Sequence, residues 1–167
     1  AANGLAADDE AGLTRTMASR DLYVCNRVLN LETGSLAAEA ALKLALARFY
    51  RTEAAQPEPA YAGQTPILLV VGNDEGGLPA NYHGTTVLAQ LMRGMWPELH
   101  AGLEKAKVWR VRPIRPNHLG DLEAAFAEGE ENGCQIAGFF HEIVMMNYGG
   151  RLLAPEFLAR AYALCRA

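Results

Sequence analysis

The sequence predicts an α/β protein with three layers, α/β/α, built around a mostly parallel sheet. Four times along the chain a short β-type run gives way to a helical period. The two most apolar runs, ILLVV (67–71) and IAGFF (136–140), show no polar alternation, which is typical of strands that helices cover on both faces. Repeated strand–helix units with such strands build a parallel sheet.

The four predicted strand–helix units follow one another along the chain. They are a weak strand at 23–30 with a helix within 32–50, a strand at 67–71 with a helix at 87–95, a strand at 107–114 with a helix at 121–131, and a strand at 134–146 with a helix at 155–166. In the first helix Leu42, Leu46 and Phe49 recur at helical spacing, so this helix is amphipathic and should lie on the sheet. A surface connection at 52–66 and a glycine-rich loop at 73–81 fall outside the units.

The length and composition indicate how many domains the chain forms and which classes of partner are unlikely. The 167 residues suit a single domain, 1–167, and 50% of them are apolar, which is enough to bury a core. A formal net charge of −4 without any Lys/Arg-rich block argues against nucleic acid as a partner. The N-terminal stretch lacks the basic region of a signal peptide, and no stretch is apolar enough to span a membrane. We therefore expect a soluble, cytoplasmic protein with no membrane partner.

The three cysteines, Cys25, Cys134 and Cys165, are far apart and form no CxxC pair. This pattern suits a reducing compartment and free, mostly buried thiols. It indicates neither a disulfide framework nor a zinc ribbon.

Polar segments follow the predicted strands, at positions where α/β proteins commonly bind ligands. In an open α/β sheet these places are the loops beyond the carboxyl ends of the strands, which lead into helix N-termini. The candidate segments are 33–35, 73–74 with its glycine loop, 81–86 and 141–147.

Thr33, Gly34 and Ser35 open the first predicted helix. The unpaired amides and positive dipole end of a helix N-terminus suit an anion such as phosphate, and Gly34 allows a close approach of the backbone. The alternative is a plain N-cap, which is the more common role of Ser or Thr at this position. No GxxxxGK[ST] is present, so the segment is not a P-loop.

The segment YHGTT (82–86) places an aromatic ring, an imidazole and two hydroxyls around a glycine. Tyr82 offers one ring face as a platform for a flat ligand, or else it packs on the core as a turn residue. For His83 the residues favour a surface or hydrogen-bonded turn histidine over a ligand-binding one.

Glu142 closely follows the apolar run 136–140 and should stand at the end of a buried strand. A carboxylate there is costly unless a ligand, a cation or hydrogen bonds compensate it. The alternative is a structural salt bridge, for which the candidate partners are Arg110, Arg112 and Arg151. His141 should point to the opposite face, and HEIVM does not match the zinc-protease motif HExxH.

Taken together and in this order, the segments resemble the class III aminotransferases of the ornithine/4-aminobutyrate type, which use pyridoxal 5′-phosphate (PLP). TGSLAAEAALKLA (33–45) is similar to the family's SG[TS]EAxExAxKxA turn and helix, and NYHGTT (81–86) is similar to its YHG[RT]T segment. The stretch 137–166 is similar to the family's strand bearing Glu-Pro, its glycine turn and its helix ending in LC. The resemblance implies the N-terminal part of the large cofactor-binding domain of such an enzyme.

The resemblance also implies roles for individual residues. The backbone of Gly34 and Ser35 would hold the PLP phosphate, and Ser35 would also serve as a cap. Tyr82 would stack on the pyridine ring, with His83 and Gly84 beside it. Two further matches concern the substrate side of the ring: Glu142 corresponds to the strand-end glutamate near the cofactor's O3′, and Asn147 to a substrate-facing glutamate of many members.

The chain also departs from the family pattern. The family's Schiff-base lysine and the aspartate that contacts the pyridine nitrogen lie beyond the residues matched here, and Lys43, Lys105 and Lys107 occupy no corresponding position. Ile143 replaces the usual proline and Met145 the usual glutamine, while NDEGGLPA (73–80) lengthens the loop before the YHG segment.

These matches and departures lead to two hypotheses of function. The first is a fragment of a PLP-dependent aminotransferase, which moves an amino group from an amine or amino acid to an oxo acid. Such a fragment would be inactive alone, and by resemblance it would form a homodimer. The second is a non-enzymatic α/β cofactor-binding or interaction module that pairs with another chain.

Overall fold

The computed structural model describes residues 6, 8–21, 24, 26–130 and 133–166. The chain divides into two compact units, Ala1–Glu32 and Thr33–Ala167. Each unit is described by itself, and the expectation of a single domain stays a prediction.

The first unit contains the helix α1, Glu10–Ala18. The Asp9 carboxylate caps it by accepting a hydrogen bond from the Gly12 amide at 2.7 Å. The predicted strand at 23–30 is wrong for the residues described there, 24 and 26–30, which belong to no strand. Instead, the side chains of Asn26 and Arg27 donate to backbone carbonyls at Ser19 and Met17. Residues 23 and 25, and with them Cys25, lie outside the described residues.

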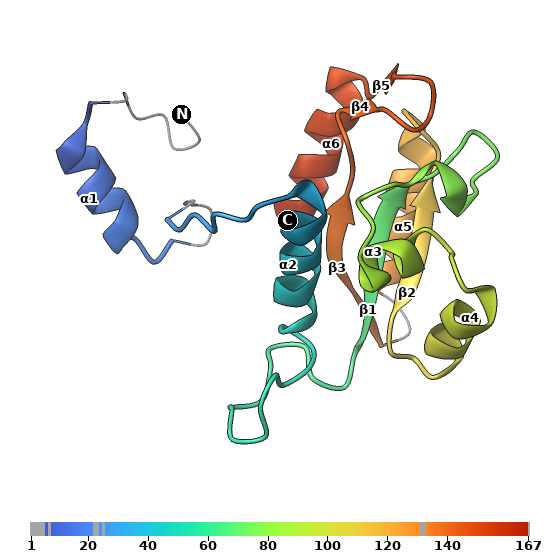
Figure 1. Ribbon diagram of the computed structural model, residues 1–167, viewed down its shortest axis with the longest axis horizontal. Helices are drawn as coiled ribbons and strands as arrows, with labels where there is room; N and C mark the ends of the chain where they lie inside the picture. The colour runs from blue at the N-terminus through green and yellow to red at the C-terminus, as the bar shows by residue number, and fades with distance from the viewer. Residues whose placement is uncertain (1–5, 7, 22–23, 25, 131–132, 167) are drawn as a thin grey trace. The chain divides into compact units, whose positions relative to one another are not determined.

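The second unit is organised by a parallel sheet with the strand order β2-β1-β3 (Figure 1). The central strand β1, Thr65–Val71, is buried along its whole length. It pairs in parallel with β2, Arg110–Ile114, on one side and with β3, Cys134–Phe140, on the other. The predicted parallel sheet and its strand at 67–71 are therefore confirmed, and the strand expected at 107–114 is confirmed for 110–114, since residues 107–109 belong to no strand. Thr65 and Pro66, expected in the surface connection, begin β1.

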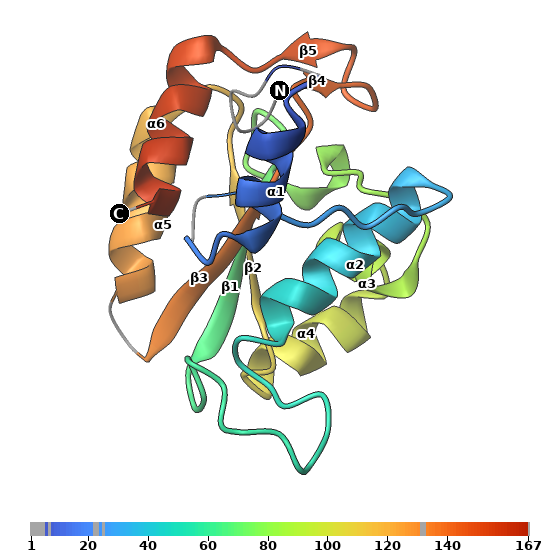
Figure 2. The ribbon, with the colours of Figure 1, turned by 90° about the vertical axis from the view of Figure 1, so that its left-hand side faces the viewer.

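Helices cover both faces of this sheet, as Figure 2 shows. Ile67, Leu69 and Val71 of β1 pack in one buried cluster with α5, Leu119–Glu130, and α6, Pro155–Arg166. The alternate residues Leu68 and Val70 pack in a second cluster with the helices of the other face. Those helices are α2, Gly34–Leu46, α3, Val87–Met92, and α4, Pro97–Lys105. Because successive side chains of a strand point to opposite faces, the apolar run ILLVV feeds both clusters.

Several short elements complete the second unit. The 3-10 turn η1, Leu78–Ala80, interrupts the loop after β1. Trp96 adopts a left-handed conformation, φ 51°, and Pro97 then begins α4, where a missing N–H costs nothing. The β-type run expected at 134–146 is divided: β3 ends at Phe140, and β4, Val144–Met145, pairs in antiparallel fashion with β5, Arg151–Leu152.

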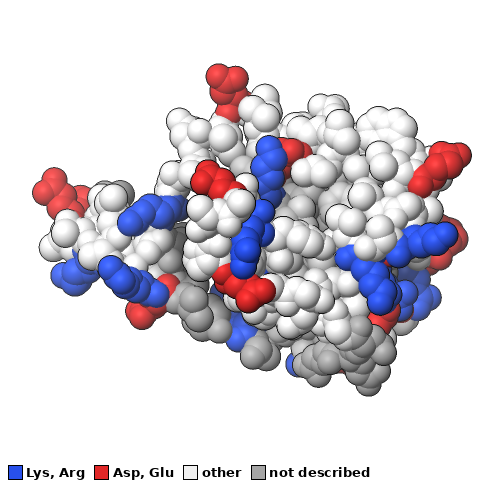
Figure 3. Space-filling view, turned by 90° about the horizontal axis from the view of Figure 1, so that it is seen from below, with Lys and Arg blue, Asp and Glu red and all other residues white. Residues whose placement is uncertain are grey.

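The described surface carries charges of both signs. On the face drawn in Figure 3, Lys and Arg side chains alternate with Asp and Glu side chains over a mostly uncharged surface. None of the helices in the described part of the chain combines the length and the apolar character needed to cross a bilayer. Cys134 is buried in the first apolar cluster, as expected, whereas Cys165 is exposed on α6.

Candidate functional site

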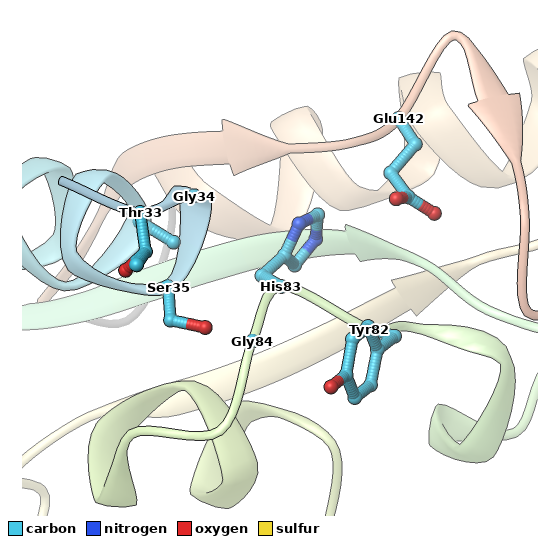
Figure 4. Close-up of a pocket in the computed structure, with 8 residues that line it drawn as sticks. Thr33, Gly34, Ser35, Tyr82, His83, Gly84 and Glu142 are labelled. Atoms are coloured by element: carbon cyan, nitrogen blue, oxygen red, sulfur yellow. The ribbon is translucent and has the colours of Figure 1, made fainter.

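A cavity of about 380 Å³ opens where α2 begins, beside the segment 82–84 and the residues that follow β3 (Figure 4). Its lining consists of Thr33, Gly34, Ser35, Ala38, Tyr82, His83, Gly84 and Glu142. All six residues predicted from the resemblance to contact a cofactor thus lie around one space. Asn147 does not line it and is exposed in the turn between β4 and β5.

Thr33 is the N-cap of α2. Its side-chain oxygen accepts a hydrogen bond from the Leu36 amide at 3.2 Å, and its carbonyl accepts from Ala37 at 3.0 Å. Ser35 is therefore inside the first turn and does not cap the helix, contrary to the expectation that it would serve both roles. The Gly34 and Ser35 amides precede the first bonded amide and have no partner among the described residues. Two backbone donors at the positive end of a 13-residue helix remain for a ligand.

Gly84 lies against this first turn. Its φ of +118° belongs to the region that favours glycine. A β-carbon on Gly84 would stand 2.4 Å from the Ser35 hydroxyl oxygen and 2.7 Å from the Ser35 Cα. The next residue, Thr85, donates its amide hydrogen to the same hydroxyl oxygen at 3.2 Å. The segment 82–85 is thereby held directly on the start of α2.

Tyr82 lines the cavity and is half-buried. The Arg93 guanidinium carbon lies 5.3 Å from the centre of its ring, within cation–π range. Arg93 is itself held by the Pro79 carbonyl, to which its Nε donates at 2.9 Å. Since the guanidinium covers one ring face, a flat ligand would have to use the other.

His83 also lines the cavity and packs edge-on against Phe140 at the end of β3, with ring centres 6.0 Å apart. Burial lowers the pKa of His83 below its ordinary value, the nearby His141 lowers it further, and a hydrogen bond to the Phe140 backbone opposes both. His83 therefore contributes a neutral imidazole to the cavity wall at neutral pH.

Glu142 extends from the segment after β3 into the cavity (Figure 4). Its predicted salt-bridge partners are engaged elsewhere: Arg110 and Arg112 each lie 3.3 Å from Glu128, and Arg151 pairs with Asp74. Among the described residues, the Glu142 carboxylate has no ion-pair partner. It presents acceptor oxygens to whatever occupies the cavity.

His141 lies on the other side of the strand end, as the alternation predicts. Its ring is 4.9 Å from Phe139 and 5.8 Å from Tyr162 of α6, and it does not line the cavity. Burial lowers the pKa of His141, while a backbone hydrogen bond at Glu142 raises it.

Asp74, from the candidate segment 73–74, does not line the cavity and instead joins two loops. It pairs with Arg151 and accepts a hydrogen bond from the Tyr148 hydroxyl at 2.9 Å. These contacts hold the pKa of Asp74 below its usual range, with the Arg151 bond as the largest cause. They tie the turn between β4 and β5, which contains Asn147, to the loop after β1.

None of the three lysines lines the cavity. Lys43 pairs with Glu39 at 3.2 Å on α2, Lys105 is the last residue of α4, and Lys107 is exposed in the following turn. The residues around the cavity can bind and orient a ligand, but they include no amine.

The comparisons with known proteins return no relative. No family model matches the chain, and no curated protein and no solved structure matches it.

Proposed function

We propose that the cavity binds pyridoxal 5′-phosphate and that the chain is part of an aminotransferase of the class III type. The observation that carries the proposal is that six residues selected by resemblance from three distant segments, 34–35, 82–84 and 142, line one cavity. The resemblance rests on the sequence of each segment, whereas their convergence depends on the fold. That the fold brings these segments around one space supports the proposal.

The two ends of the cavity suit the two ends of the cofactor. The Gly34 and Ser35 amides and the Ser35 hydroxyl provide donors for the phosphate. Tyr82 provides a ring face for the pyridine, and the unpaired Glu142 carboxylate provides an acceptor on the O3′ side. Bound PLP supplies an electrophilic aldehyde and an electron-withdrawing ring to amino-group chemistry.

The proposal assigns binding, and not the full reaction, to these residues. Transfer of an amino group from an amine or amino acid to an oxo acid needs a lysine at the cofactor, and none lines the cavity. The lysine would come from another part of the protein or from another chain, in a homodimer or a complementing pair in the cytoplasm. The lack of a cavity lysine equally favours the second candidate, a non-enzymatic module that binds the cofactor and pairs with another chain.

Pyridoxine 5′-phosphate provides the test of binding. It keeps the ring and phosphate of PLP but has an alcohol in place of the aldehyde, so it cannot form covalent adducts with the exposed Lys105 and Lys107. Calorimetry should detect binding to the whole chain and weaker binding of pyridoxine. Ser35→Ala and Tyr82→Ala should each lower the affinity for the phosphate ester about tenfold, the loss expected of one charge-assisted hydrogen bond or one stacking contact.

Matched controls are Ser19→Ala and Tyr61→Phe, at positions that do not line the cavity. If the wild-type chain binds neither compound, or if the cavity variants bind as well as the controls, the cofactor assignment is wrong. Supplying a lysine-bearing partner chain and measuring transamination then separates the enzyme fragment from the non-enzymatic module.

A further inference from the structure

We infer that Gln90 is a positioning residue for the donor end of the cavity and that it acts through a single peptide group to orient the Ser35 hydroxyl. This inference rests on the proposed function, because it names a residue that prepares the same site for the phosphate ester. Gln90 does not line the cavity, and no motif in the sequence marks it.

The Gly84–Thr85 peptide group is held at both of its polar ends. Gln90 Nε2 donates to the Gly84 carbonyl oxygen at 2.5 Å. The Thr85 N–H of the same peptide donates to Ser35 Oγ at 3.2 Å. A peptide group is planar, so fixing its carbonyl also fixes the direction of its N–H. Gln90 on α3 thereby sets where the donor to Ser35 points.

The direction of this chain of hydrogen bonds favours an anion. Ser35 Oγ accepts from Thr85, and a hydroxyl that accepts one hydrogen bond still has its own hydrogen to donate. All the donors then point in the same direction. The side-chain amide of Gln90 donates to the Gly84–Thr85 peptide, the peptide donates to the Ser35 hydroxyl, and the hydroxyl donates into the cavity. Successive hydrogen bonds of this kind polarise one another, so the hydroxyl becomes a better donor.

The first turn of α3 sets the backbone position of Gln90. Its backbone amide donates to the Thr86 carbonyl at 2.9 Å, within the first turn of α3. The Thr86 hydroxyl caps that turn by accepting from Ala89 at 3.4 Å. Neither Gly84 nor Thr85 belongs to a helix or strand, so no regular backbone ladder fixes their shared peptide.

Amide hydrogen exchange tests the peptide clamp without any ligand. Exchange of the Thr85 amide, followed by NMR, should become about fivefold faster in Ser35→Ala and also in Gln90→Met, the factor expected for one neutral hydrogen bond. Gln90→Met keeps the side-chain length but removes the donor. The double variant should be no faster than Ser35→Ala alone, since both changes remove one coupled interaction. Gln56→Met, at an exposed position away from the cavity lining, is the control.

Ligand affinity tests the consequence for the site. Gln90→Met should weaken the binding of pyridoxine 5′-phosphate about fivefold, again the effect of one hydrogen bond. The affinity for pyridoxine should stay unchanged. If Gln90 had a purely structural role, the variant would bind both ligands more weakly by the same factor. The ratio of the two affinities therefore distinguishes positioning of the Ser35 hydroxyl from a general loosening of the site.

The outcomes separate this inference from the proposed function. Unchanged Thr85 exchange in Gln90→Met overturns the clamp, whatever the chain binds. An unchanged ratio of affinities overturns the positioning role even where the cofactor ester binds well. If the wild-type chain binds no phosphate ester, the proposed function fails and the role of Gln90 in anion binding fails with it, while hydrogen exchange still decides the clamp.

Discussion

Gly84 lies so close to Ser35 that a β-carbon on Gly84 would stand 2.4 Å from the Ser35 hydroxyl oxygen. Through this contact, the segment that carries Tyr82 and His83 is joined to the helix start that carries the free amides. The cavity therefore depends on the absence of one methyl group.

Gly84→Ala should destabilise the protein and abolish ligand binding. The φ of +118° and the clash with Ser35 act together, and we expect a loss of about 2–4 kcal/mol in the free energy of unfolding. Urea denaturation provides the measurement. Gly63→Ala is the matched control, since Gly63 also has a positive φ, 80°, but a β-carbon there meets nothing within 4 Å. Equal losses in the two variants would show that strain alone, and not the contact with Ser35, matters at Gly84.

Thr33→Ala and Ser35→Ala should separate helix capping from ligand binding. Thr33→Ala removes the N-cap of α2 and should lower the free energy of unfolding by about 1 kcal/mol. Ser35→Ala leaves that cap intact and should affect ligand affinity more than stability. Thr86→Ala, which removes the cap of α3, is the reference for the cost of a lost cap. A larger stability loss in Ser35→Ala than in Thr33→Ala would contradict this division of roles.

The parts of the fold that could be predicted are those with strong patterns. β1 is an uninterrupted apolar run, and α2 repeats apolar residues at helical spacing, so the pattern of apolar residues indicates both. The segments around the cavity come together because they occupy strand ends and a helix start, which a parallel sheet brings to one edge.

The parts that could not be predicted have no pattern to find. α4 has only nine residues and none of them is fully buried, and β4 and β5 contain two residues each. The described residues of the expected strand at 23–30, which are 24 and 26–30, include apolar side chains but form no strand, since a strand also needs a neighbour to bond with. The same limit applies at the site, where the contact of Gln90 with Gly84 depends on how α3 is oriented.

Asp121 should make the stability of the protein depend on pH below neutrality. The hydrogen bond from Arg115 is the largest cause that lowers the pKa of Asp121, from 3.8 to about 2, and His118 adds to it. A lowered carboxyl pKa stabilises the folded state above pH 3.8, and this stabilisation is lost as the pH falls from 3.8 toward 2. With solvent screening, we expect a contribution on the order of 1 kcal/mol. Chemical denaturation across pH 2–6 should show a shallower decline for Asp121→Asn than for wild type, whereas Asp8→Asn, at an exposed position, should follow wild type.

The contacts of Asp74 with Arg151 and Tyr148 should control the order of the turn between β4 and β5. Asp74→Asn removes the charge and should speed amide exchange across residues 145–150. Because both partners of the ion pair are partly exposed, 1 M salt should reproduce part of this effect in the wild-type chain. Glu142 lies between β3 and β4, and β4 leads into this turn. The loosened turn should therefore also modestly lower the affinity for pyridoxine 5′-phosphate. Arg160→Gln, which breaks an exposed pair with Glu123 between α5 and α6, is the control. If that variant loosens the turn as much as Asp74→Asn does, the effect is a general one and Asp74 does not hold the turn.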